Sequence, residues 1–212
     1  MYDRVLVPTD GSTGTAHVAM QAFDLAEQYG ASVHLLHVID SNVGRMFADS
    51  AESRAEMRDS GRRALATLEE LASGYDIETV SELREGEPWK EILACADDID
   101  ADVIVMGTNG RSGIERRLIG SVTERVVRHS DNPVLTVRLP ETSETVTDDE
   151  EAAAIVSERL EADGYGAVDV EGASRHRNVW VVDVTADGSP YTVYVDPVTR
   201  RTSAVHRTES EL

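Results

Sequence analysis

Three glycines and a serine near the middle of the chain have the types and the spacing to hold a phosphate group. Gly107, Gly110, Gly120 and Ser121 form the pattern Gly-x2-Gly-x9-Gly-Ser, directly after the apolar run 103–106. Glycine lets the backbone take positive φ and approach a ligand closely, and the unpaired N–H groups at a helix start attract anions. Ser121 either adds a hydroxyl donor or caps the helix. The pattern therefore predicts a phosphate-binding loop between a strand and a helix.

The spacing differs from two common nucleotide-binding motifs. No lysine follows Gly120, which excludes the phosphate loop that ends in Gly-Lys-Ser/Thr, and the Gly-x-Gly-x-x-Gly dinucleotide turn does not fit either. Between Gly107 and Arg128, five arginines stand against two glutamates, a local net charge of +3 in a chain of −20. Such a segment attracts anions, although the same glycines also suit a loop without a ligand. At these residues the chain resembles the ATP-binding branch of the universal stress protein family, whose motif has this spacing.

Strand and helix patterns alternate along the first part of the chain and position this loop. Short apolar runs predict strands at 4–8, 32–39, 77–83, 103–106 and 133–138, and helical spacing predicts helices at 15–29, at 51–73, after 87 and after 121. This order predicts an α/β fold, a doubly wound five-stranded parallel sheet with helices on both faces. The resemblance implies the strand order 3-2-1-4-5. Ligands of such sheets bind at the carboxyl ends where the order reverses, which would put Asp10 and Gly107 at one crevice.

The resemblance also implies how ATP would bind. Pro8 and Asp10 would lie under the adenosine, with Asp10 accepting hydrogen bonds from the ribose, and Val38 and Met106 would touch the base. A carboxylate suits a ribose diol and backbone N–H groups suit phosphate, but Asp10 also suits an Asx turn with Gly11, and Val38 and Met106 also suit plain core. Whether Mg²⁺ accompanies the phosphates stays open. The residues expected to line the phosphates are Gly107, Gly110, Gly120, Ser121, Val122 and Thr123.

Other groups of reactive side chains fit their chemistry less well. His34 and His37 are three residues apart on a strand, so they point to opposite faces and cannot both bind one metal ion. Ser12, His17 and Asp10 lie close together in sequence but lack the nucleophile-elbow pattern of a hydrolase. The sequence therefore predicts no catalytic residue and no metal ligand.

Composition restricts the partners and the compartment. Forty acidic residues stand against twenty basic ones, of which only Lys90 is lysine, so a broad nucleic-acid-binding face is excluded. This balance looks like a haloarchaeal protein from a salt-rich cytoplasm, where salt screens the repulsion, or like an acidic mesophile protein. Cys95 is the only cysteine and is expected as a buried hydrophobe on a helix. No leader pattern and no membrane-length apolar run is visible, so we expect a soluble cytoplasmic protein that binds no membrane.

The character of the chain changes after residue 140. We expect a nucleotide-binding domain at 1–140, an acidic linker at 141–150, and a smaller α+β domain at 151–212. A helix at 152–160 precedes strands at 167–170, 179–185, 191–195 and 202–206, and Asp187-Gly188 predicts a hairpin. With Trp180 in VWVVDV and the run YTVYVDPVTR, this part resembles a PepSY-type domain. Such domains are binding or inhibitory modules, so a protein partner of unknown identity is implied.

Two main classes of function follow. The first is a nucleotide-binding stress-response regulator, a dimeric sensor or switch. The alternative is a slow ATPase or a nucleotidyl-transfer enzyme, which lacks a visible catalytic base or metal cluster. A ligand-free structural dimer is a third class, against which the intact glycine pattern argues. The last strand, Val134–Val137, would expose unpaired backbone groups, so it pairs across a homodimer, as in the family, or the second domain covers it.

Overall fold

The computed structural model describes residues 2–12, 14–41, 51–108, 119–138, 145–176 and 179–207, without the side chains of 51–53. The chain divides into two compact units, Met1–Leu139 and Pro140–Leu212. Each unit has its own sheet and its own buried core, and each is described by itself below. No helix in these described ranges is long and apolar enough to cross a membrane.

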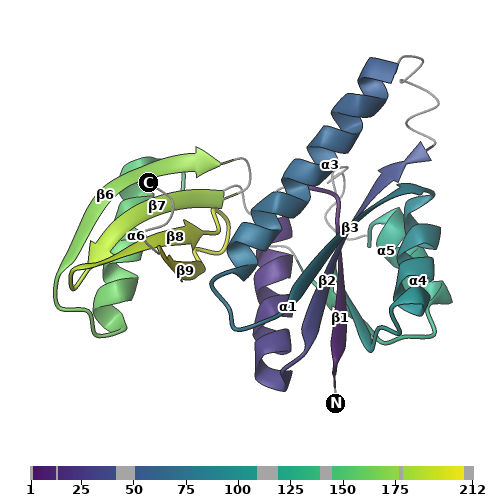
Figure 1. Ribbon diagram of the computed structural model, residues 1–212, viewed down its shortest axis with the longest axis horizontal. Helices are drawn as coiled ribbons and strands as arrows, with labels where there is room; N and C mark the ends of the chain where they lie inside the picture. Colours follow the sequence, from purple (N-terminus) through teal and green to yellow (C-terminus); the bar gives the residue numbers. More distant parts are fainter. Residues whose placement is uncertain are drawn as a thin grey trace. The chain divides into compact units, whose positions relative to one another are not determined.

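The first unit is built on a five-stranded parallel sheet with the order β3-β2-β1-β4-β5. Helices α1 and α3 cover one face of this sheet, and α4 and α5 cover the other (Figure 1). The predicted doubly wound fold and its strand order are therefore confirmed. The elements are β1 (Arg4–Thr9), α1 (Thr15–Tyr29), β2 (Ser32–Asp40), α3 (Ala51–Ala72), β3 (Thr79–Gly86), α4 (Pro88–Asp98), β4 (Val103–Gly107), α5 (Ser121–His129) and β5 (Val134–Val137).

Local sequence explains most of these boundaries. Helix α4 begins at Pro88, a position where proline's missing N–H costs nothing. Helix α1 ends before Gly30, whose φ of 67° lies in the left-handed region that favours glycine. Strand β3 differs from the prediction because it begins at Thr79 and continues to Gly86. The parallel ladder with β2 supplies hydrogen-bond partners along that whole length, although the last residues of β3 are charged.

The sheet face under α4 and α5 carries a continuous apolar core. Leu6 of β1 and Ile104 of β4 are fully buried there, together with Ile92 and Cys95 of α4 and Val126 of α5. Burying one such aliphatic side chain contributes roughly 1.5–3 kcal/mol. The expectation that Cys95 is a buried residue of a helix is confirmed.

The opposite face is packed closely against α3. A Cβ added to Gly61 of α3 would lie 2.7 Å from the Cδ2 atom of His37, so this helix needs a glycine where it crosses the sheet. His37 is only 7% exposed. The side chain of His34 instead contacts Glu82 at 3.0 Å on the α4 face. The two histidines therefore lie on opposite faces, as predicted from their spacing.

The second unit is an antiparallel sheet with one helix packed against it. The strand order is β6-β7-β8-β9, and α6 packs its apolar side against the sheet around Trp180, Val182 and Val184 (Figure 1). Asp187 and Gly188 form the predicted hairpin turn between β7 and β8, both with positive φ, at 49° and 83°. The elements are α6 (Asp149–Ala162), β6 (Val168–His176), β7 (Val179–Ala186), β8 (Ser189–Val195) and β9 (Thr202–His206).

Two expectations for this unit are corrected. The acidic linker was expected to extend through residue 150, but Val146 is fully buried in the core and its carbonyl accepts the indole N–H of Trp180 at 3.0 Å. The side chain of Asp148 then caps α6 by accepting the N–H of Glu151 at 2.8 Å. The strand expected to end at Val170 continues to His176, paired with β7. The prediction ended too early because a bulge shifts the register after Val170, so the residues that follow do not continue the alternation that marks a strand.

Candidate functional site

The strand order brings the two predicted halves of the site to one edge of the sheet. Strands β1 and β4 are parallel neighbours, with Val5 opposite Val103 and Leu6 opposite Ile104. The order reverses at this pair, because β2 lies on the far side of β1 and β5 on the far side of β4. The chain leaving β1 continues into Asp10, and β4 ends at Gly107. Both therefore lie at the carboxyl ends of the strands, where ligands of doubly wound sheets bind.

The segment after β1 is held in a tight turn. The carboxylate of Asp10 accepts the backbone N–H of Ser12 at 3.0 Å, which is the Asx turn considered as an alternative role. The hydroxyl oxygen of Thr9 accepts the N–H of Gly11 at 3.0 Å, and φ of Gly11 is 70°. A carboxylate offers about four acceptor positions, so accepting from Ser12 is compatible with further hydrogen bonds to the same group. Asp10 is half-buried and fixed in direction.

The segment after β4 is fixed to the start of α5. The hydroxyl of Thr123 donates to the carbonyl of Gly107 at 2.9 Å, and the N–H of Gly120 donates to the carbonyl of Thr108 at 2.6 Å. Thr123 is 4% exposed, so this bond is shielded from water. The N-terminus of α5 is thereby held beside the end of β4. Gly110 lies outside the described residues, as do its neighbours from 109 to 118.

Glycine 120, not Ser121, is the residue that precedes the helix. Gly120 is the N-cap of α5, with φ −57° and ψ 147°, and no side chain caps the helix there. Ser121 is the first residue of the helix, so it does not cap α5, which was one of the two roles considered for it. Gly107 ends a strand and is absent from the residues with positive φ among those described, so the freedom of glycine to take positive φ is not used at this position. The first turn of α5 thus carries N–H groups that no capping side chain occupies.

The residues expected around a base lie on the α4 and α5 face. Met106 is 5% exposed and belongs to the buried cluster of that face, and Val38 and Val122 pack against the same cluster. Pro8 is half-buried and lies two residues after Leu6, so it points to the same side of the sheet. The core role considered for Val38 and Met106 is therefore real. It does not exclude a contact with a base at the rim of the cluster.

Acidic neighbours partly neutralise the positive charge of α5. Arg125 forms an ion pair with Glu87 at 3.0 Å, and Arg128 forms one with Glu124 at 2.7 Å. Hydrogen bonds from Lys90 and then Trp89 hold the pKa of Glu87 below its ordinary value. These arginines are engaged on the helix surface. The three arginines between Gly110 and Gly120 lie outside the described residues.

Two residues that order the site were not singled out from the sequence. Thr9 hydrogen-bonds Gly11 two residues on, a turn signal that the Thr-x-Gly spacing contains. Thr108 ties the N-cap of α5 to β4 and, through its own N–H, to the carbonyl of Val137 at 2.9 Å. No local pattern indicates that second role, because the bonded residues are brought together only by the parallel pairing of β4 and β5.

The fold and this edge define an α/β protein with a glycine-rich segment at the switch point of its sheet. The family model described as "Universal stress protein family" matches residues 1–138, and the chain belongs to that family. A universal stress protein of Methanocaldococcus jannaschii is 36% identical over 143 residues, which cover 66% of this chain and 84% of the relative. The resemblance drawn from the glycine spacing is confirmed at the level of the family.

Solved structures resemble about two thirds of the chain. A hypothetical protein solved as a test case of structural genomics has 26% identity and a TM-score of 0.60, and the match covers 67% of this chain and 99% of that one. A universal stress protein in complex with cAMP has 27% identity and a TM-score of 0.52, with 64% and 97% covered. Both matches extend over almost the whole of the compared structure.

Proposed function

We propose that this protein binds ATP at the carboxyl ends of β1 and β4 and acts as a stress-response regulator. One observation carries the proposal: Asp10 and the start of α5, which follow different strands, are fixed at the same switch point of the sheet. The structural relative in complex with cAMP supports an adenine nucleotide as the class of ligand. Membership of the universal stress protein family supports a role in stress response rather than in metabolism.

Each part of ATP has a chemically suitable partner in this arrangement. The carboxylate of Asp10 accepts hydrogen bonds from the ribose hydroxyls, and Pro8, Val38 and Met106 offer an apolar surface to the base. The backbone N–H groups that open α5, from Ser121 to Thr123, together with the glycines before them, bind the phosphates. The partial positive charge of the helix terminus strengthens that binding. Mg²⁺ would bind through the phosphate oxygens, with water completing its shell.

The regulatory role requires an output, for which two further proposals are made. The first is a homodimer through β5, one of the two edge strands of the described sheet, whose Leu135 is 45% exposed. The second is that the unit 140–212 acts as a PepSY-like module that binds a protein partner in a salt-rich cytoplasm. Nucleotide binding at the first unit would then change which partner or dimer state is favoured.

Isothermal titration calorimetry with ATP, AMP and GTP is the direct test. Gly120→Val places a side chain where the backbone must approach phosphate, but its φ of −57° is one that valine adopts without strain. Binding should therefore weaken about tenfold or more while the fold is kept. Gly172→Val is the matched control, because no atom lies within 4 Å of a Cβ at that position.

Two results would count against the proposal. Equal ATP affinity in the wild type and Gly120→Val, or no binding in either, would remove the phosphate site from this segment. Hydrolysis faster than about one ATP per second would instead place the protein in the enzyme class considered as the alternative, since turnover defines that class.

A further inference from the structure

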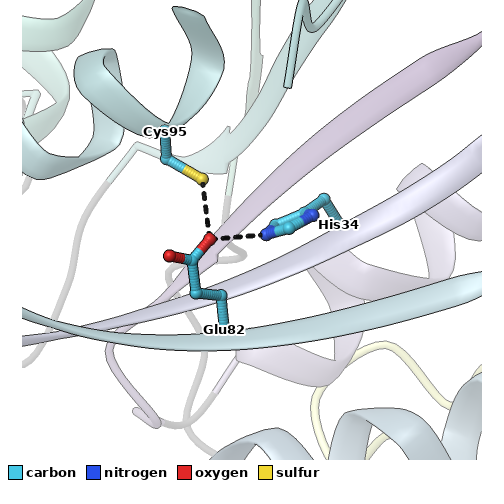
Figure 2. A group of neighbouring side chains, drawn as sticks. All are labelled: His34, Glu82 and Cys95. Carbon is cyan, nitrogen blue, oxygen red and sulfur yellow. Dashed lines mark hydrogen bonds and ion pairs between the residues drawn. The ribbon is translucent and has the colours of Figure 1, made fainter. Parts of the chain in front are cut away.

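A second group of reactive side chains lies on the sheet away from the strand ends. His34 of β2, Glu82 of β3 and Cys95 of α4 converge on one point, as Figure 2 shows. The Nε2 atom of His34 is 3.0 Å from Oε2 of Glu82, and Sγ of Cys95 is 3.7 Å from the same oxygen. All three atoms lie within 4.8 Å of one another. Residues distant in sequence thus present one nitrogen, one oxygen and one sulfur to a common centre.

The register of the sheet explains the convergence. In the β2–β3 ladder His34 pairs with Val80 and Leu36 with Glu82, so His34 and Glu82 are diagonal neighbours on one face. Leu36 is fully buried in the same core as Cys95, which places that face under α4. Two strands and a helix therefore fix the three side chains. Sites built on regular elements hold their geometry better than sites built on loops.

The three atoms match the ligands of a zinc ion in type and in spacing. Imidazole nitrogen, carboxylate oxygen and thiolate sulfur are the ligands that Zn²⁺ takes from proteins. Tetrahedral zinc with bonds of roughly 2.0–2.3 Å separates its ligand atoms by roughly 3.3–3.8 Å. Two of the three separations here are 3.0 and 3.7 Å, and the third, between His34 and Cys95, is within 4.8 Å, so the three atoms lie close to this triangle. We propose that His34, Glu82 and Cys95 bind one Zn²⁺ ion, with water as the fourth ligand.

Hydrogen bonds from Arg84 orient the carboxylate of Glu82. Its Nε donates to Oε1 of Glu82 at 2.7 Å, and its Nη2 donates to Asp98 at 2.9 Å. The shorter bond from Arg84 thus goes to Oε1 of Glu82, while Oε2 faces His34 and Cys95, and such a hydrogen bond orients a ligating carboxylate. Nη2 of Arg84 also contacts Oε2 of Glu82 at 3.2 Å, and the metal ion replaces this contact.

The charges of the group balance with the ion in place. Zn²⁺ is neutralised by the carboxylate of Glu82 and the thiolate of Cys95, and Arg84 remains paired with Asp98. Without the ion the thiol keeps its proton, since burial raises the pKa of Cys95 to about 12. Formation of the Zn–S bond therefore breaks the S–H bond, and the proton leaves to the solvent. The carboxylate of Glu82 binds through a lone pair. Neutral imidazole binds through Nε2 after its single ring proton has moved from Nε2 to Nδ1, so neither group releases a proton to the solvent.

Solvent can reach the group from the side of Glu82. The side chain of Glu82 is 35% exposed and that of His34 is 15% exposed, whereas Cys95 is fully buried. An ion entering from the Glu82 side meets the carboxylate first and the sulfur last. Without a metal ion, the same atoms form a network in which Arg84 is the only cation in contact with Glu82 among the described residues apart from a protonated His34. The experiment below separates these two states.

Cobalt(II) is the probe of choice, because it occupies zinc sites and its bond to a thiolate gives a near-ultraviolet charge-transfer band. The full chain, stripped of metal and nucleotide, is titrated with Co²⁺ and then with Zn²⁺. Excess Mg²⁺ is present to saturate the acidic surface, since Mg²⁺ prefers oxygen ligands. One equivalent of Co²⁺ should give the thiolate band, and one equivalent of Zn²⁺ should abolish it.

Variants assign the band to this group. Cys95→Ser should lose the band, and His34→Gln should weaken Zn²⁺ binding by about tenfold or more. His129→Gln is the matched control, because this exposed histidine of α5 hydrogen-bonds the carbonyl of Arg125 and lies outside the group. No thiolate band in the wild type, or equal binding in His34→Gln and His129→Gln, would overturn the proposal. The spectrum of the wild type alone can refute the zinc proposal, so the test remains decisive even if a variant fails to fold. Nucleotide is absent from every titration, so a negative result for zinc would leave the ATP proposal unaffected.

Discussion

Asp10→Ala tests whether the carboxylate at the end of β1 binds ribose or only shapes a turn. The structure shows that Asp10 accepts the N–H of Ser12 at 3.0 Å, so the substitution removes this hydrogen bond from the folded protein whether or not ATP is bound. Because Asp10 is only half-buried when no ligand covers it, water weakens this bond, and it contributes roughly 0.5–1.5 kcal/mol to the free energy of unfolding. The proposed bonds to ribose add a second loss, which appears only when ATP is bound.

The two losses have different magnitudes and can be measured apart. A hydrogen bond to a charged acceptor contributes roughly 1.5–3 kcal/mol, so Asp10→Ala should weaken ATP binding about tenfold to a hundredfold. Asp10→Asn keeps an oxygen that can accept from Ser12 but removes the charge. It should change the free energy of unfolding by less than about 0.5 kcal/mol while still weakening ATP about fivefold.

Urea unfolding without ligand and calorimetry with ATP measure the two terms on the same three proteins. The expected pattern is a stability loss in the alanine variant alone and an affinity loss in both variants. If Asp10→Ala lowers the free energy of unfolding but leaves the Kd of ATP within roughly twofold, Asp10 is a turn residue and the ribose contact is wrong.

Three further predictions address the assembly, the surface and the polar group under α4. Leu135→Asp, at the exposed edge strand β5, should convert the proposed dimer to a monomer by light scattering; a wild-type monomer would refute that dimer. The melting temperature should fall steeply below about 0.5 M KCl, where the screening length exceeds about 4 Å; a flat profile would make the acidic surface incidental. Hydrogen bonding from Arg84 lowers the pKa of Glu82 below its reference of 4.5, so Glu82 stabilises the fold above that pH and this contribution disappears as pH falls through the lowered value. Urea unfolding of Glu82→Gln should therefore show its deficit at neutral pH and lose it in acid.

Local patterns were sufficient to predict the first unit. Apolar runs of strand length separated by helical spacing determined the order of elements, and the glycine spacing at residues 107–121 indicated the family whose strand order the sheet adopts. The same patterns put Cys95 on a buried helix face and His34 and His37 on opposite faces of β2. The strand order came from the resemblance to the family, whereas the other properties depend on residues close together in sequence, which is why the sequence alone could predict them.

The features that could not be predicted depend on distant residues. Val146 is a single apolar residue in an acidic stretch and shows no period, yet it fills the core beside Trp180. Strand β6 lost its pattern at the bulge after Val170. The grouping of Glu82 with His34 follows from the register of β2 and β3, which no spacing in the chain reveals. The position of Gly110 lies outside the described residues, so its predicted contact with phosphate stays a prediction.

The two proposed sites share one buried core, and this has a thermodynamic consequence. Met106, beside the proposed base site, and Cys95, a proposed zinc ligand, belong to the same cluster of packed residues between the sheet and α4. A closely packed core transmits a displacement of α4 to the strands beneath it, because it has few voids to absorb it. If zinc draws α4 towards β2 and β3, the affinity for ATP changes by some factor. Linkage then requires ATP to change the affinity for zinc by the same factor, so a regulator with both sites would report metal and nucleotide together.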